Sequence, residues 1–201
     1  DVHDQGTYMT GWAPYVRARG DARALDFLKR RRDAIHDHFV ANGQWYHGYW
    51  CMQEAHHGTE HFDLFLGTLL SLDPGDAETR RQILNATEHI GNWVETVPSW
   101  YDHESHLFRS MYMGTREVRT EPGMALNIAD HLRYARLCLL AREAGGGERY
   151  LRLASDYAGI WADALLSRAS LPLGLLPVPP RFLLREAAVA TSWGFAGMAR
   201  E

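Results

Sequence analysis

Apolar residues recur along most of the chain with a period of about 3.6 residues, which predicts amphipathic helices. No segment shows the sustained alternation of a half-buried strand. We therefore expect an all-α protein made of antiparallel helical hairpins. The predicted helices span Asp21–Ala41, Glu54–Leu72, Ala77–Val97, Gly123–Ala144, Glu148–Ser167 and Arg181–Arg200.

Two short turns indicate how these helices are joined. The segments Asp73–Asp76 and Gly145–Gly147 contain the residues that end one helix and begin the next, so each should connect antiparallel neighbours. The helix over Glu54–Leu72 is apolar on several sides and should be the most buried. Gly91–Trp93 and Gly159–Trp161 are similar in type, which predicts a weak repeat of stacked hairpins.

Composition narrows the classes of partner. The 201 residues suit one domain, and 21 basic against 25 acidic residues give a formal charge of −4. This balance offers no basic surface for nucleic acid or for an anionic membrane, and no apolar run is long enough to span one. The basic run Lys29–Arg32 should be a solvated helix face. A small molecule or a sugar is the expected ligand.

The sequence gives little information on compartment. Cys51 and Cys138 are too few for a disulfide framework and do not have metal-binding spacing, so two buried thiols are expected. No signal peptide is visible, and a first residue of Asp1 is compatible with a processed N-terminus. Localisation therefore stays open.

The segment His56–His61 concentrates three imidazoles and a carboxylate at the start of an apolar helix. At helical spacing His57, Glu60 and His61 are i, i+3 and i+4 neighbours, so their side chains can converge on one ligand. His56 should point elsewhere. We expect His57 and His61 to be candidate ligands of one divalent metal ion, with Glu60 or a loop histidine completing the set. No organic cofactor is expected.

Two longer connections carry most of the remaining chemistry. The segments 42–50 and 98–122 are rich in aromatic, histidine and arginine side chains, whereas the other turns are short. This asymmetry predicts a functional face at one end of the molecule. Aromatic rings can pack against the C–H groups of a sugar, although the same rings could fill the core beneath the loops. The candidate substrate-binding residues are Trp45, His47, Trp50, Trp100 and Tyr112.

Helical hairpins with short Pro-Gly-Asp or Gly-Gly-Gly turns, an apolar inner helix and the loop Gln44–Trp50 resemble the (α/α) toroid enzymes of carbohydrate metabolism. The resemblance is architectural and covers residues 21–177. That class contains glycoside hydrolases, unsaturated uronyl hydrolases, sugar epimerases and polysaccharide lyases. A closed toroid needs more helices than are readable here, so the resemblance implies a partial or complete ring, with further chain or a second copy completing it.

The resemblance and the residue types together favour a lyase. Removing the proton beside a uronate carboxylate requires a base and a positive field for the developing enolate. Tyr46 or His106 would abstract the proton, and Arg109 would bind the carboxylate. Glu60 and its neighbouring histidines, with or without a metal, would stabilise charge. The expected substrate is an acidic oligosaccharide or polysaccharide.

Three alternatives remain open at this point. A toroid glycoside hydrolase would pair Glu60 with Asp102 or Glu104 across the scissile bond. His57, Glu60 and His61 also match the His-x-x-Glu-His pattern of an inverted zinc peptidase, whose fold carries β-sheets. A non-catalytic helical scaffold that binds a partner along one face is the third.

Overall fold

The computed structural model describes residues 2–91, 95, 99–167 and 174–175. This part of the chain is mostly helical, as the periodicity predicts, and its strands are two-residue pairs in the connections. The predicted helix over Arg181–Arg200 lies outside the described residues. The helices are α1 (Val2–Arg19), α2 (Ala22–Ala41), α3 (Ala55–Glu60), a π-helix (His61–Gly67), α4 (Thr68–Leu72), α5 (Ala77–Glu88), a 3₁₀-helix (Ala129–His131), α6 (Leu132–Glu143) and α7 (Glu148–Leu166).

The strands form four separate antiparallel pairs. β1 (Trp45–Tyr46) pairs with β2 (Tyr49–Trp50), β3 (Gln53–Glu54) with β6 (Tyr112–Met113), β4 (Tyr101–Asp102) with β5 (Leu107–Phe108), and β7 (Asn127–Ile128) with β8 (Gly174–Leu175).

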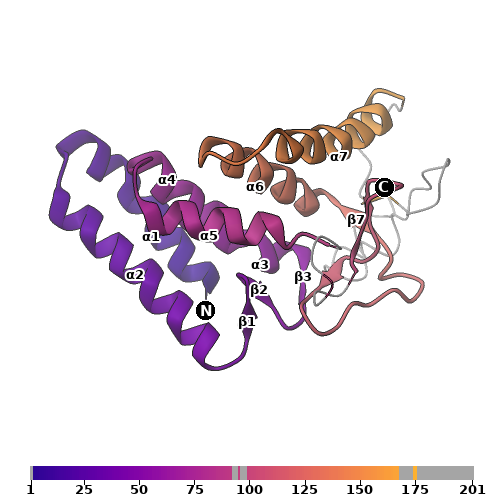
Figure 1. The fold of residues 1–201 in the computed structure, drawn as a ribbon, viewed down its shortest axis with the longest axis horizontal. Helices are drawn as coiled ribbons and strands as arrows, with labels where there is room; N and C mark the ends of the chain where they lie inside the picture. Colours follow the sequence, from indigo (N-terminus) through magenta and orange to yellow (C-terminus); the bar gives the residue numbers. More distant parts are fainter. Residues whose placement is uncertain (1, 92–94, 96–98, 168–173, 176–201) are drawn as a thin grey trace, which may run out of the picture.

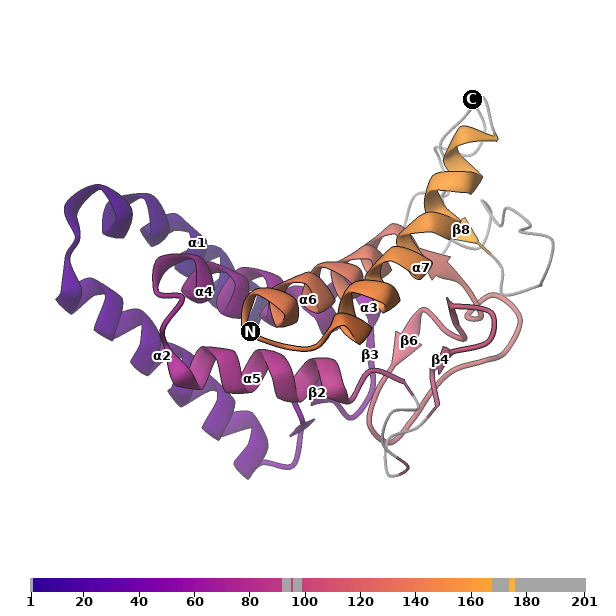
Figure 2. The same cartoon turned by 45° about the horizontal axis from the view of Figure 1, so that its top comes forward.

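The short turns and the long connections lie at opposite ends of the molecule. Figures 1 and 2 show α6 and α7 as an antiparallel pair beside α5, with α1 and α2 on the other side of the α3–α4 segment. The turns α1–α2, α4–α5 and α6–α7 lie at one end, and the strand pairs lie towards the other. The predicted asymmetry of short and long connections is therefore present in the fold, but the described residues do not form a closed ring.

The segment from α3 to α4 is buried on two sides. Phe62 and Leu66 belong to the larger hydrophobic core, which includes α6 and α7, while Phe65 and Leu69 belong to a second core with α1 and α2. This explains why the sequence is apolar around most of the helix rather than along one stripe. A π-helix interrupts the segment, a feature that is often found near functional sites.

Two helices are shorter than predicted. α5 ends at Glu88 rather than near Val97, and Gly91 beyond it has a positive φ of 63°. A Cβ on Gly91 would lie 2.4 Å from the Cβ of Tyr101, so glycine is required by both the conformation and the close approach. Gly159, its expected counterpart in the repeat, lies inside α7, and the two glycines are not equivalent.

α6 begins at Leu132 rather than near Gly123, because polar side chains hold Asn127 and Ile128 in strand β7, which is followed by the 3₁₀-helix Ala129–His131. Asn127 is fully buried, and its amide accepts a hydrogen bond from the N–H of Phe108 (2.8 Å) and donates one to the carbonyl of Phe108 (2.7 Å). His131 Nδ1 accepts from the N–H of Ile128, and its Nε2 lies 3.1 Å from the carbonyl of Ser110. Burial lowers the pKa of His131 to about 4, which suits this neutral, structural role.

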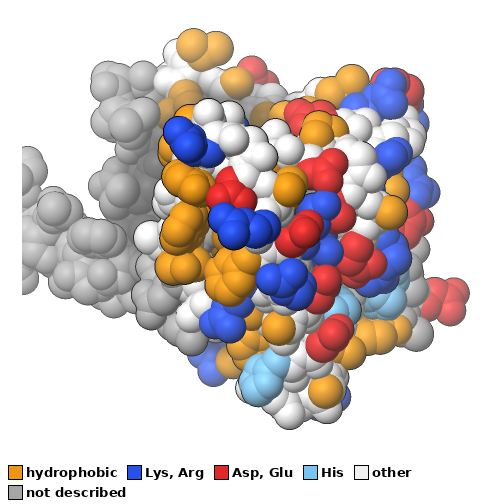
Figure 3. Space-filling view, turned by 90° about the vertical axis from the view of Figure 1, so that its left-hand side faces the viewer, with side chains coloured by type: hydrophobic (Ala, Val, Ile, Leu, Met, Phe, Trp, Pro, Cys, Tyr) orange, Lys and Arg blue, Asp and Glu red, His pale blue; other side chains and the backbone are white. Residues whose placement is uncertain are grey.

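Charged side chains tie α2 to the α4–α5 turn. Lys29 pairs with Asp73 at 2.6 Å and with Asp76 at 3.3 Å, and the guanidinium of Arg32 bonds to Asp76. Arg32 is only 2% exposed, so the prediction that Lys29–Arg32 is a solvated face is wrong for this residue. Figure 3 shows the resulting mixture of basic and acidic side chains at the end of the molecule that carries the turns.

Cys138 is buried as predicted, while Cys51 is half-buried, and both are free thiols. Among the described residues, no helix has both the length and the apolar character needed to cross a bilayer.

Candidate functional site

A polar cleft of about 390 Å³ lies between the end of α5, the loop that joins β4 to β5, and the first half of α7. Its side chains are almost all ionisable, unlike those of the larger hydrophobic core, to which the lining residue Leu153 belongs. The residues that line it are Glu88, His103, His106, Arg149, Arg152, Leu153 and Asp156.

The β4–β5 hairpin presents both histidines of the cleft. Asp102 ends β4 and organises the loop, because its carboxylate accepts hydrogen bonds from the N–H of Glu104 (3.1 Å) and the hydroxyl of Ser105 (3.0 Å). His106 then adopts a positive φ of 56°, which is uncommon for a residue other than glycine. Such strained positions are concentrated at functional sites. The fully buried Asn127, bonded to Phe108, anchors the second strand of this hairpin.

The two histidines differ in their surroundings. His106 Nδ1 lies 3.7 Å from the carboxylate of Asp156 on α7. Burial, followed by the positive charge of His106, lowers the pKa of His103, so His103 is held towards its neutral form. A carboxylate beside one imidazole and a neutral second imidazole are the components of acid–base chemistry near neutral pH.

The two arginines of the cleft also differ. Arg149 pairs with Glu88, whose carboxylate also accepts a hydrogen bond from the hydroxyl of Tyr150 at 2.7 Å. Arg152, one helical turn further along α7, makes no ion pair within the described part of the chain. Arg149 therefore links α7 to the end of α5 at the side of the cleft, and Arg152 can bind an incoming anion.

The candidate base Tyr46 lies at the turn of the other hairpin, β1–β2, and is 47% exposed. Next to it, His47 also has a positive φ of 56°, and its ring stacks on His89 with 3.3 Å between centroids. Burial and the charge of His89 lower the pKa of His47. Because Glu88 and His89 are adjacent at the end of α5, the two hairpins flank the same helix terminus. This places Tyr46, His47 and His106 at one end of the molecule.

The tryptophans predicted to bind sugar lie mostly in the interior. Trp45 and Trp100 are buried, Trp45 against Phe39 and Trp100 against Phe108. Trp50 is half-buried and packs edge-on against Trp45. The two buried rings are core residues beneath the loops and are left out of the proposed site.

Arg109 and Tyr112 lie outside the cleft. Arg109 follows β5 and reaches back to Asp102, with 3.9 Å between the charged groups. Tyr112 is half-buried on β6 opposite Glu54 of β3, and the guanidinium of Arg119 lies 5.0 Å from its ring centroid. Tyr112 is thus adjacent to the start of α3 rather than to the β4–β5 loop.

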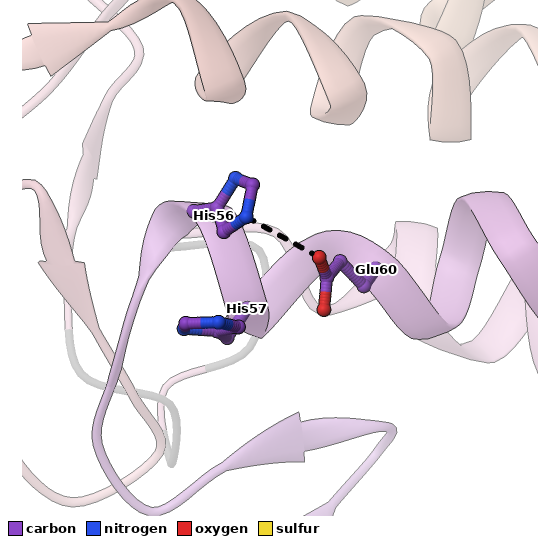
Figure 4. A group of neighbouring side chains, drawn as sticks. All are labelled: His56, His57 and Glu60. Carbon is purple, nitrogen blue, oxygen red and sulfur yellow. Dashed lines mark ion pairs between the residues drawn. The ribbon is translucent and has the colours of Figure 1, made fainter. Parts of the chain in front are cut away.

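The histidine-rich helix start forms a second cluster (Figure 4). Its members are His56, His57 and Glu60, whose ligand atoms all lie within 4.8 Å of one another. The sequence-based trio instead contained His61. His61 is buried one turn further along the helix, where its ring packs on Trp45.

Burial and the positive charge of His36 lower the pKa of His61 to about 3. His61 also lines a small cavity of about 10 Å³ together with His47 and Gly48, but His57 and Glu60 do not line this cavity. The structure therefore groups His57 and Glu60 with His56, and groups His61 with the β1–β2 turn.

Sequence reasoning did not single out Glu88, Arg149, Arg152 or Asp156. A signal for three of them was present, because Arg149, Arg152 and Asp156 are spaced i, i+3 and i+7 and must share one face of a helix. That face opposes the β4–β5 loop only because of the tertiary fold. Comparison of the chain with protein-family models, with curated proteins and with solved structures gave no match. Any functional assignment therefore depends on the geometry of these side chains.

Proposed function

We propose that the chain is part of an (α/α) toroid carbohydrate-active enzyme that cleaves a uronate-containing oligosaccharide or polysaccharide by β-elimination. The observation that supports this proposal is the convergence of two histidines and two arginines in one cleft. β-Elimination needs a base for the proton beside the uronate carboxylate and a cation that neutralises that carboxylate as negative charge develops.

In this proposal His106 is the base. It removes the proton from the ring carbon next to the carboxylate, the electron pair forms the carbon–carbon double bond, and the bond to the departing glycosidic oxygen breaks. The departing oxygen takes a proton from water, and the hydroxide that results takes the proton from the His106 imidazolium, which restores the base. Asp156 stabilises the imidazolium that forms, because its carboxylate lies 3.7 Å from Nδ1.

Arg152 binds the uronate carboxylate in the same scheme. Arg152 lines the cleft, and Arg149 is already paired with Glu88. A guanidinium can hold a carboxylate through two parallel hydrogen bonds, which fixes the sugar ring relative to the base. Tyr46 and His47, on the neighbouring hairpin, would contact a further sugar unit.

The same geometry is less suited to the alternatives. A glycosidase needs two carboxyl groups facing each other across the scissile bond, whereas the carboxylate of Glu88 is already engaged by the side chains of Arg149 and Tyr150. A zinc peptidase of the His-x-x-Glu-His type needs His57 and His61 on one metal, and these residues point into different surroundings.

The proposal is tested by incubating the full chain with pectate, alginate, glucuronan and a heparinoid while ultraviolet absorbance is followed. Elimination produces an unsaturated sugar that absorbs, and mass spectrometry should show a product lighter by one water than the hydrolysis product. New reducing ends without absorbance would favour a glycoside hydrolase. A folded protein that turns over none of the four substrates would favour the scaffold.

A further inference from the structure

The cluster at the start of α3 is built like the inner shell of a metal site. Glu60 is 3% exposed, and its Oε1 lies 3.4 Å from Nε2 of His56. This distance is longer than a good hydrogen bond. It matches the separation of two ligands on a tetrahedral ion, which is about 3.4 Å for bonds of about 2.1 Å.

Each imidazole has a carboxylate beside its Nδ1 nitrogen. His56 Nδ1 lies 3.0 Å from Asp130, and His57 Nδ1 bonds to Glu54. When Nδ1–H donates to a carboxylate, the neutral ring carries its lone pair on Nε2, which is the atom that binds a metal. Carboxylate–histidine pairs of this kind fix the tautomer and the ring orientation around metal ions.

Glu54 is held rigidly enough for this task. Its carboxylate caps α3 by accepting hydrogen bonds from the N–H groups of His56 (2.7 Å) and His57 (3.1 Å). The same side chain therefore fixes the backbone of the helix start and the ring of His57. Its backbone is paired in the β3–β6 ladder opposite Tyr112.

The local charge also favours a cation. Among the described residues, three carboxylates surround the cluster, those of Glu54, Glu60 and Asp130. One guanidinium, that of Arg133, lies beside them. It is 3.5 Å from Asp130 and donates a hydrogen bond to the carbonyl of His56 at 2.8 Å. Three negative charges against one positive charge leave an excess that a divalent ion would neutralise.

We propose that His56, His57 and Glu60 bind one zinc-class divalent cation, with Glu54 and Asp130 as the outer carboxylates. Two imidazoles and one carboxylate suit a transition metal rather than Mg²⁺ or Ca²⁺, which prefer oxygen ligands. Because the side chain of His57 is 48% exposed, solvent reaches the cluster, and a coordination position remains for water or a substrate oxygen. This inference goes beyond the proposed lyase activity and does not depend on it.

Calorimetric titration of the chelator-treated full chain with Zn²⁺ tests the site. We expect one equivalent to bind, and the same titration with Mg²⁺ to give no comparable binding. His56→Ala and Glu60→Gln should each abolish the zinc-binding event, whereas the exposed His38→Ala on α2 should leave it unchanged. Circular dichroism of each variant establishes whether its helices are retained.

Two further measurements remain informative if a ligand variant fails to fold. Glu54→Gln keeps the shape of the side chain but replaces the anionic partner of His57, and should weaken zinc binding about 10–100-fold. Co²⁺ added to the unmodified chain should give the intense visible bands of a four- or five-coordinate ion. The absence of a zinc-binding event in the unmodified chain, or binding that survives both His56→Ala and Glu60→Gln in folded protein, would overturn the proposal.

Discussion

Asn127→Ala should destabilise the protein strongly, because Asn127 links the β4–β5 hairpin to the start of α6. The amide of Asn127 makes two hydrogen bonds to the backbone of Phe108, and both residues are buried. Truncation leaves a buried N–H and a buried carbonyl unpaired, at about 1–3 kcal/mol each. The expected loss in the free energy of unfolding is therefore about 2–6 kcal/mol, a large part of the about 5–15 kcal/mol that stabilises a typical domain.

Urea denaturation followed by tryptophan fluorescence measures this loss, since Trp100 stacks on Phe108. With a slope of about 2 kcal/mol per molar urea, the midpoint should fall by about 1–3 M. Asn42→Ala, at an exposed position, is the matched control and should change stability by at most about 0.5 kcal/mol.

Asn127→Asp separates the hydrogen-bond argument from simple loss of volume. At neutral pH the carboxylate can accept from the N–H of Phe108 but cannot donate to its carbonyl, and it buries a charge. Its folded-state pKa should be raised, so protonation favours the folded state and the deficit should shrink as pH falls towards 4. An Asn127→Ala midpoint equal to that of the unmodified chain, or an Asn127→Asp deficit independent of pH, would refute the reasoning.

Three further predictions follow from other parts of the fold. Arg32→Ala should lower the free energy of unfolding, measured by urea denaturation, by about 3–5 kcal/mol, because it leaves Asp76 without its buried partner. The pKa of Asp76 is lowered in the folded state, so this stabilisation is present above the unfolded pKa and is lost as pH falls towards the folded value. The stabilities of the variant and the unmodified chain should therefore converge in acid. Burial and the neighbouring His106 lower the pKa of His103, so the midpoint of its imidazole titration, followed by NMR, should lie below the ordinary histidine value of 6.5. Burial raises the pKa of Cys138, so a thiol reagent should label Cys51 in the folded chain and Cys138 only after unfolding, as peptide mapping would show.

Most of the main helices could be predicted from the sequence, because their apolar residues recur with a strong period and their turns contain clear stop signals, but α1 (Val2–Arg19) was missed. The observed α2, α5 and α7 begin within one residue of the predicted starts. The early end of α5 could not be found from periodicity, since it depends on the contact between Gly91 and Tyr101, which are ten positions apart along the chain. The late start of α6 likewise depends on Asn127 bonding to a distant backbone.

The candidate site was only partly visible in the sequence. His57 and Glu60 could be grouped by helical spacing, but the choice between His56 and His61 depends on which side of the helix the second core covers. The cleft itself could not be predicted, because Glu88, the β4–β5 loop and α7 are brought together by the packing of α6 against both α5 and α7 and not by a motif. The tryptophans drew attention to the segments 42–50 and 98–122, but Trp45 and Trp100 are buried and support these loops rather than forming an exposed surface.

The most direct test of the account compares kcat/KM for β-elimination, on whichever acidic polysaccharide the chain cleaves, among three variants with retained helical circular dichroism. His106→Gln should lower it by about 10²–10⁴-fold, the usual contribution of a positioned base. Arg152→Ala should lower it mainly through a higher KM, and His38→Gln should leave it unchanged. Elimination by His106→Gln at the rate of the unmodified chain would contradict the assignment of the cleft as the active site.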